Sequence, residues 1–468
     1  MLHGGRRPSH SPAASRPGLG EARTAPRGPT GNLRGVPDRS EEARDLIEFI
    51  DESPSPFHAV QAAARRLHDL GFERLDEAAN WPPGPGRHVV IRGGSLVAWI
   101  CDDSRRVEEG FRIIGAHTDS PNLRIKPNPD TGAAGFRQLG VEVYGGALLN
   151  SWLDRDLGLS GRVALRDGSG GAHLQLVRVD RPLLRIPQLA IHLDRGVNET
   201  GLKLNPQQHL VPVWGVGSTG EGTFQRFLAD ELGVGPDDIL GWELMAHDLC
   251  PSALVGVDEE LVSAPRIDNL ASCYAALRAL EDLPPATGAG PVPVICLFDH
   301  EEIGSQSARG ADSTMLPTVL ERICLAAARE REAFHRSLAR SMCASVDGAH
   351  ATHPNYPDRH EPQHQIRVNG GPVLKVNSNV RYATDAAGAA TFALACEWAG
   401  VPLQRFVTRT DLPCGSTIGP VTAARLGVPT VDVGLPQLAM HSARELCGAA
   451  DPALLIAALT GFLEVPGP

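Results

Sequence analysis

The sequence predicts an α/β protein with helices on both faces of its sheet and a long β-rich insertion in the chain. Three observations support this fold class. After about residue 265, short apolar runs alternate with helical segments, which is typical of α/β sheets. Residues 120–257 are instead strand-like and rich in turns. The length of 468 residues allows two to three domains, so we expect one α/β domain that is split in sequence by the insertion.

The ordered chain is expected to begin near Ser40. Residues 1–38 are rich in Pro, Gly, Ser and Arg, have almost no large apolar side chains, and are therefore expected to form a disordered leader. Beyond it, helical periodicity, a Gly-Gly turn and an apolar run predict two helices, a hairpin and a strand. These elements cover residues 40–50, 58–70, 87–100 and 111–116.

The remaining elements show the same two sequence patterns, strand-like and turn-rich within the insertion and alternating apolar and helical after it. Within the insertion we expect strands over residues 141–146 and 173–179. After it we expect helices over residues 269–280 and 385–399 and buried strands over residues 293–298, 341–346 and 429–433. The predicted domains are a discontinuous α/β domain, residues 39–119 and 258–468, and an inserted domain, residues 120–257.

Composition excludes several classes of function. The net charge is −11, and the basic leader makes the rest of the chain more acidic still, which argues against nucleic-acid binding. We find no apolar run of about 18 residues and no signal peptide, so neither a membrane nor secretion is expected. Nine scattered cysteines without a CxxC pair indicate reduced thiols and a cytoplasmic location.

Acidic and imidazole side chains follow several of the predicted strands. Ligands of open α/β sheets gather at the carboxyl ends of strands, so we expect these side chains to meet. One such segment alone is more often a cap or a satisfied polar group, whereas the set is difficult to explain by chance. The segments are AHTDSP (116–121), RIDNL (266–270), DHEEIGS (299–305), VDGAH (346–350) and AMHS (439–442).

This inventory fits two adjacent divalent cations, because zinc accepts imidazole and carboxylate ligands and paired ions can share a carboxylate and a water. His117 and His441 can each bind one ion. Asp119 can accept the other ring N–H of His117 and orient it. In the Glu301-Glu302 pair, one carboxylate can bind metal while the other acts as a general base; the alternative is a solvated helix start.

Seven segments together resemble the M18 family of metalloaminopeptidases, the aspartyl aminopeptidases. The resemblance runs from about residue 40 to the C-terminus and is specific in order, spacing and flanking residues. The segments are AHTDSPNLRIKP from Ala116, AIHLDR from Ala190, RIDNL from Arg266, DHEEIGS from Asp299, SVDGAHATHPNY from Ser345, VLKVNSNVRYAT from Val373 and MHSARE from Met440.

The resemblance implies a mixed-sheet α/β/α zinc-exopeptidase catalytic domain interrupted by a β-rich dimerisation domain. It implies two zinc ions per subunit, with Mn²⁺ or Co²⁺ as possible substitutes. It further implies cleavage of the N-terminal residue of peptides, preferably Asp or Glu, in a homo-oligomer that is a dodecamer built from dimers. The implied metal ligands are His117, Asp268, Glu302, Asp347 and His441, with Asp268 bridging.

Other roles are implied in the same way. Glu301 is the expected catalytic base, and His192 is expected to reach a neighbouring subunit's active site, hold substrate and stabilise the oxyanion. His350 and Lys375 are expected to contact substrate, with Lys375 pairing with an acidic side chain. Without the resemblance, His192 reads as an ordinary core or surface histidine and Lys375 as a solvated lysine at a strand edge.

The sequence leaves three alternative functions. A deacylase or carboxypeptidase with a related two-metal site would bind a free carboxylate in place of a free amine. A non-catalytic shell protein would have lost a ligand or the base, and none is missing here. Two-metal hydrolysis of nucleic acid is disfavoured because the acidic chain lacks a basic or aromatic platform.

Overall fold

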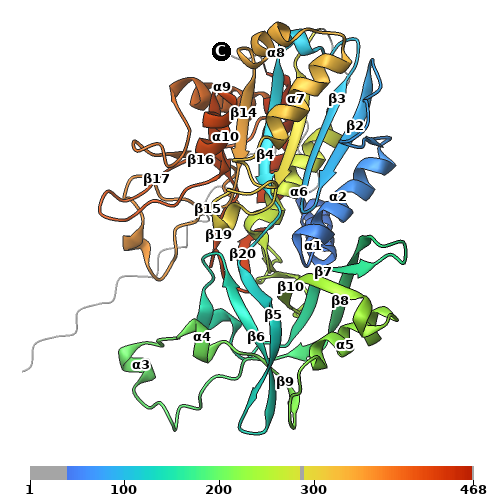
Figure 1. The fold of residues 1–468 in the computed structure, drawn as a ribbon. Helices are drawn as coiled ribbons and strands as arrows, with labels where there is room; N and C mark the ends of the chain where they lie inside the picture. Colours follow the sequence, from blue (N-terminus) through green and yellow to red (C-terminus); the bar gives the residue numbers. More distant parts are fainter. Residues whose placement is uncertain (1–38, 285–288, 466–468) are drawn as a thin grey trace, which may run out of the picture. The chain divides into compact units, whose positions relative to one another are not determined.

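A computed structural model describes residues 39–284 and 289–465. The expected disordered leader, residues 1–38, lies outside the described residues. Within them the strands form sheets of nine, six and five strands (Figure 1). No helix in this part of the chain combines the length and apolar character needed to cross a membrane.

The nine-stranded sheet is mixed, as the sequence predicts. Its four central strands, β13, β4, β14 and β18, run parallel to one another, whereas β3 and β16 run antiparallel to their neighbours β13 and β18. In spatial order the strands are β1 (Glu73–Arg74), β2 (Gly86–Arg92), β3 (Ser95–Cys101), β13 (Val292–Phe298), β4 (Phe111–His117), β14 (Met342–Val346), β18 (Thr430–Gly434), β16 (Val373–Val376) and β17 (Gln404–Val407).

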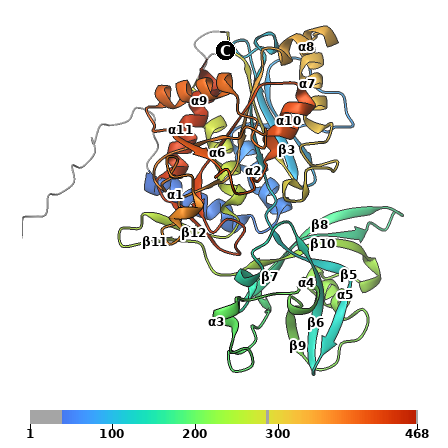
Figure 2. The same cartoon turned by 90° about the vertical axis from the view of Figure 1, so that its left-hand side faces the viewer.

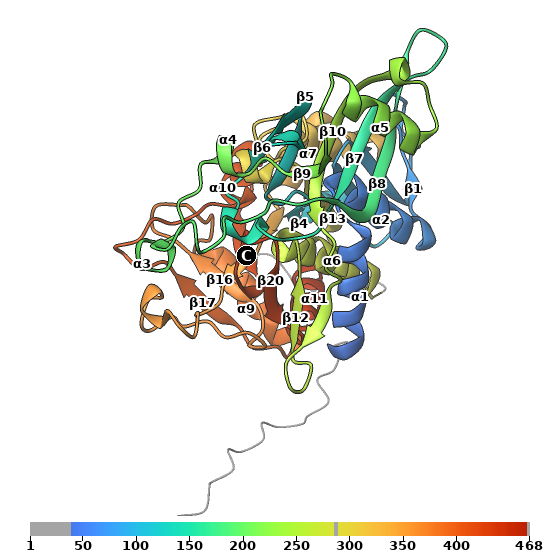
Figure 3. The same cartoon turned by 90° about the horizontal axis from the view of Figure 1, so that it is seen from below.

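Helices cover both faces of this sheet because its central strands are apolar on both sides. On β4, Phe111 and Ile113 face one core, and Ile114 and Ala116 face the other. One face packs against α1 (Arg39–Glu52), α2 (Pro56–Asp69), α6 (Ile267–Glu281), α9 (Ala386–Ala399) and α11 (Asp451–Glu464); the other packs against α7 (Met315–Ala326), α8 (Arg331–Leu338) and α10 (Ile418–Leu426) (Figure 2). Within the first layer, α6 and α11 lie side by side with α1 (Figure 3).

The six-stranded sheet is antiparallel throughout and comes entirely from the predicted insertion. Its own core includes Phe224 and Leu228 of α5, which pack against the sheet. Spatially it runs β8 (Ala172–Leu184), β7 (Leu157–Arg166), β10 (Ile239–Asp248), β5 (Asn122–Ala133), β6 (Phe136–Tyr144) and β9 (Val213–Val216), with α3 (Val197–Thr200), α4 (Pro206–His209) and α5 (Thr223–Leu232) in its connections.

The five-stranded sheet joins segments from distant parts of the sequence. It runs β11 (Ala253–Val255), β12 (Leu261–Ala264), β20 (Glu445–Gly448), β19 (Pro436–Leu438) and β15 (Ala349–His350). Because β12 leads into α6 and pairs with β20, this sheet brings the start of α6 beside the β19–β20 loop. The same loop contains His441.

The expected helices are present within two residues of their expected bounds. The second begins at Pro56, two residues earlier than expected, because the side chain of Ser55 caps it by accepting a hydrogen bond from the His58 N–H. The strand expected over 141–146 ends at Tyr144, where β6 stops. All nine cysteines are free thiols, in agreement with the reduced state predicted from the sequence.

Candidate metal centre

Three adjacent parallel strands deliver most of the polar side chains of the site. His117 is the last residue of β4, and Asp347 directly follows β14 on one side of it. On the other side, β13 leads into a 3₁₀ turn, Glu301–Ile303, that begins with Glu301 and Glu302. Because these strands end at the same edge of the sheet, their side chains meet there.

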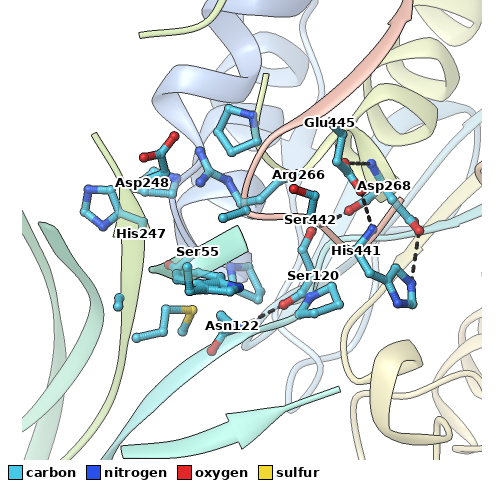
Figure 4. Close-up of a pocket in the computed structure, with 18 of the residues that line it drawn as sticks. Ser55, Ser120, Asn122, His247, Asp248, Arg266, Asp268, His441, Ser442 and Glu445 are labelled. Carbon is cyan, nitrogen blue, oxygen red and sulfur yellow. Dashed lines mark hydrogen bonds and ion pairs between the residues drawn. The ribbon is translucent and has the colours of Figure 1, made fainter. Parts of the chain in front are cut away.

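Two further side chains reach the site from outside the nine-stranded sheet. Asp268 is the second residue of α6, where the backbone is not yet helical (ψ 104°). His441 lies in the loop between β19 and β20 and has a positive φ of 67°. Figure 4 shows the His441 ring pointing toward the Asp268 carboxylate.

Asp268 divides its two carboxylate oxygens between the two histidines. Its Oδ1 lies 3.4 Å from His117 Nε2, and its Oδ2 lies 3.4 Å from His441 Nε2. Asp347 Oδ1 lies 3.6 Å from His117 Nε2, and Glu302 Oε2 lies 3.5 Å from His441 Nε2. The five predicted ligands therefore form two groups that share Asp268.

These separations are those of ligands around an ion. They exceed the usual 2.7–3.2 Å of a hydrogen bond to nitrogen. Two atoms that each lie about 2.0–2.1 Å from one ion at a tetrahedral angle are roughly 3.3–3.4 Å apart. In addition, Asp268 Oδ1 and Glu302 Oε1 are buried and have no hydrogen-bond partner among the described residues. Buried carboxylate oxygens without donors fit a cation, so the residues present match the donor set of paired zinc ions.

Both imidazoles direct Nε2 at the carboxylates because a carbonyl accepts a hydrogen bond from the other ring nitrogen. His117 Nδ1 donates to the backbone carbonyl of Asp119 at 2.9 Å, and His441 Nδ1 donates to the carbonyl of Gly146 at 3.0 Å. These hydrogen bonds leave each Nε2 available as a ligand. The Asp119 carboxylate, expected to be the acceptor from His117, lies farther from Nδ1, at 3.4 Å.

Without ions, the cluster balances its negative charge with protons. Burial lowers the pKa of His441, but Asp268 and Glu302 raise it to about 10. Burial also lowers the pKa of His117, but the neighbouring carboxylates raise it by more. The pKa of His117 therefore lies well above its usual value. Burial would raise the pKa of Asp268, yet the two neighbouring histidines lower it. Cations can replace these protons, so metal binding is expected to release protons.

Glu301 and Glu302 occupy different environments. The Glu302 side chain is 4% exposed and faces His441, whereas Glu301 is 16% exposed and its Oε2 lies 3.9 Å from His117 Nε2. Burial raises the pKa of Glu301 to about 8, with Asp347 adding to this shift and His117 opposing it. Of the two, Glu301 is thus the one placed to exchange a proton with a substrate or water.

Asp119 is fully buried and connects several parts of the site. Its carboxylate accepts hydrogen bonds from the backbone N–H groups of Glu301 and Glu302, both at 3.1 Å. It also accepts one from the hydroxyl of Tyr144 at 2.7 Å, and Tyr144 belongs to the six-stranded sheet. The inserted sheet thus helps to hold the carboxylate that positions the Glu301-Glu302 turn.

Sequence reasoning did not identify three of these supporting groups, namely Tyr144, Gly146 and Glu445. Glu445 is buried and accepts the backbone N–H groups of Asp268 and His441. Its place in the segment MHSARE, four residues after His441, was the only sequence signal that could have pointed to it.

The predicted substrate-binding residues are not all close to the cluster. His192 lies in an exposed turn between β8 and α3, and no hydrogen bond or ion pair among the described residues joins it to the metal ligands. Lys375 is buried, unlike the solvated lysine that its local sequence suggests. Its Nζ donates to the carbonyls of Asp347 and Gly348 at 3.3 and 3.2 Å.

A cavity opens beside the cluster next to Met440, the residue before His441. The ring of His350 contributes to its wall and lies 6.0 Å from the ring of Phe406. Tyr382 and Arg409 also line this cavity. Its mixture of aromatic and basic side chains is suited to part of a peptide.

The sequence is similar to those of known proteins. The family model described as "Aminopeptidase I zinc metalloprotease (M18)" matches residues 49–463. A probable M18 family aminopeptidase 2 of Mycobacterium bovis is 57% identical over 428 residues, which are 90% of this chain and 98% of the relative.

The chain is also similar to proteins of known structure. The chain is 39% identical to one in a cryo-EM structure of the Ape4 and Nbr1 complex, with a TM-score of 0.87 over 91% of this chain and 86% of that one. It is 28% identical to one in the structure of the S. cerevisiae mApe1 dodecamer, with a TM-score of 0.79 over 90% and 96% of the two chains.

Proposed function

The chain belongs to the M18 family of zinc metalloproteases and is a zinc-dependent aminopeptidase, and from that premise we propose that two zinc ions and Glu301 carry out the hydrolysis. In this proposal His117, Asp268 and Asp347 hold one ion, and His441, Glu302 and Asp268 hold the other. The observation that carries it is the division of the Asp268 oxygens between the two histidines, each at 3.4 Å.

The reaction adds water across the N-terminal peptide bond. Bound zinc ions would supply acidification of water and polarisation of the scissile carbonyl. Glu301 takes a proton from the attacking water, whose oxygen forms a bond to the carbonyl carbon. Glu301 then returns that proton to the leaving nitrogen as the C–N bond breaks. Glu301 suits this role because its side chain is partly exposed and its Oε2 lies 3.9 Å from His117 Nε2.

Substrate recognition requires groups around the metal ligands. We propose that His192 of one subunit reaches the site of its neighbour and donates a hydrogen bond to the developing oxyanion. His350, on the wall of the cavity beside Met440, would contact the peptide. We propose that Lys375 gives the enzyme a preference for N-terminal Asp or Glu. Among the described residues, the carboxylate oxygen nearest its ammonium group is Asp347 Oδ2, at 3.8 Å.

The proposed assembly follows from the same premise. Residues 39–119 and 258–468 would form the catalytic domain, and residues 120–257 a dimerisation domain. Support comes from the six-stranded sheet, which is built wholly from the second range and has its own core. We propose a homo-oligomer, specifically a dodecamer built from dimers. The related mApe1 structure is that of a dodecamer.

Hydrolysis of a panel of aminoacyl-anilides tests the function. Protein stripped of metal is expected to be inactive and to regain activity when zinc is restored. Glu301→Gln should bind zinc normally and lose activity by about 10²–10⁴-fold, the usual contribution of a general base. The rate for Asp- and Glu-anilides should exceed that for Leu- or Lys-anilides.

Two outcomes would contradict the proposal. Wild-type activity in Glu301→Gln would remove the base. Faster cleavage of N-acetyl-Asp peptides than of free Asp peptides would favour a deacylase, because such an enzyme does not need the free amine.

A further inference from the structure

Glu445 is a buried carboxylate that neither the metal set nor the reaction uses. It is the first residue of β20, pairs with Ala264 of β12 and is 3% exposed. No ion pair among the described residues neutralises it. A buried carboxylate without a cationic partner costs free energy, so the hydrogen bonds of Glu445 must offset that cost.

Both carboxylate oxygens accept backbone hydrogen bonds from residues that belong to the metal centre. Glu445 Oε2 accepts the N–H of Asp268 at 2.9 Å, and Oε1 accepts the N–H of His441 at 2.7 Å. Figure 4 shows the three residues joined in this way, with Asp268 and His441 facing each other. The two donors lie on segments that are far apart in sequence.

The chemistry of these contacts requires two acceptor atoms. A glutamine in the same place would offer one acceptor oxygen and turn its NH₂ group toward the other backbone N–H. An apolar side chain would leave two buried N–H groups without a partner, at about 1–3 kcal/mol each. A carboxylate is therefore the group that can hold both backbones at once.

We propose that Glu445 is a positioning residue that fixes Asp268 and His441 relative to each other and thereby sets the affinity of one metal position. That position is the group of Asp268, Glu302 and His441. The other position shares Asp268 but is completed by His117 and Asp347, with which Glu445 makes no hydrogen bond among the described residues, so Glu445 affects it less. The inference rests on the proposed two-ion function.

Zinc titration of the full chain against a competing chelator tests the proposal. Wild type is expected to bind two ions. Glu445→Gln should weaken the position at His441 by about 10–100-fold, as is usual when a group that orients a ligand is lost, and the position at His117 by less. Glu445→Asp keeps the charge but shortens the side chain by one methylene, and it should likewise weaken the position at His441.

The matched control is Glu42→Gln. Glu42 is also buried and hydrogen-bonded, to Tyr274 and Arg278, but these residues do not contact the metal ligands. Its zinc affinities should equal those of wild type, even though its melting temperature falls.

Either of two results would overturn the inference: both ions bind Glu445→Gln as tightly as wild type, or both affinities fall equally in Glu445→Gln and Glu42→Gln. Failure of the two-ion function itself would look different, because wild type would then bind fewer than two ions.

Discussion

At the scale of single residues, the site depends on hydrogen bonds that fix the metal ligands before any ion binds. Each histidine donates from Nδ1 to a backbone carbonyl, and Asp119 accepts the N–H groups of both glutamates of the Glu301-Glu302 turn. Ligands held in this way lose little conformational entropy when they bind an ion.

Tyr144→Phe tests this support at Asp119. The substitution removes the hydroxyl that donates to Asp119 Oδ2 at 2.7 Å and leaves the ring beneath the Arg124 guanidinium, 4.0 Å from its centroid. We expect zinc affinity to fall by about 10-fold, with little change in KM, because Tyr144 is buried and its hydroxyl is directed at Asp119. Chelator titration and steady-state kinetics measure both quantities; unchanged affinity would show that the hydroxyl is dispensable.

The proposed metal ligands could be predicted from the sequence, but the residues that support them could not. His117 ends a strand and Asp347 directly follows one, so strand-end chemistry identifies them. Asp268 and Glu302 are the second residues of a helix and of a 3₁₀ turn. The contacts of Tyr144 depend on how the inserted sheet approaches the other sheet. Such tertiary contacts leave no local pattern, and for the same reason the buried state of Lys375 was missed.

At the scale of elements, close packing between strand ends holds Asp347 in place. The site directly after β14 lies against β18, where a Cβ on Gly434 would lie 1.7 Å from the carbonyl oxygen of Asp347. Only glycine fits this approach. The end of β18 thus restricts the backbone of a proposed metal ligand.

Gly434→Ala is therefore expected to lower both stability and zinc affinity. The forced shift should cost about 1–3 kcal/mol of unfolding free energy and displace Asp347. Gly161→Ala is the matched control, because its Cβ would lie 2.0 Å from the carbonyl of Glu243 in the six-stranded sheet. It should lose similar stability in denaturant titrations and keep its zinc affinity. Equal loss of affinity in both variants would contradict this account.

Periodicity and apolar runs predicted the central strands and four of the helices to within two residues, and α2 begins earlier than expected because Ser55 caps it. The strands of the insertion were predicted less well, since β6 begins at Phe136 and β8 continues to Leu184. Other helices were not assigned from the sequence. In α11, for example, nearly every side chain is buried, so no polar face marks the helical period. The strand order could not be predicted either, because β13 lies between β3 and β4 although it follows them by about 180 residues in sequence.

At the scale of the whole molecule, the segment with His192 has features of a contact surface between subunits. Leu189, Ile191 and Leu193 flank the histidine and are 59%, 47% and 76% exposed. Clustered exposed apolar side chains mark interaction sites in soluble proteins. The resemblance to M18 enzymes predicted this role for His192, which local sequence alone could not indicate.

Complementation between subunits tests that role. His192→Ala and Glu301→Gln should each be nearly inactive alone. In mixed oligomers, a Glu301→Gln subunit supplies His192 to a His192→Ala neighbour, so random pairing should restore about a quarter of wild-type sites. Activity equal to the sum of the two parents would show that His192 does not act across an interface.

The central claim is that five side chains from distant parts of the chain hold two zinc ions around Asp268. The most direct test is a zinc anomalous-scattering map from crystals of the zinc-loaded protein. The account predicts two peaks on either side of the Asp268 carboxylate, one beside His117 and Asp347 and the other beside His441 and Glu302. A single peak, or peaks away from these five residues, would contradict it.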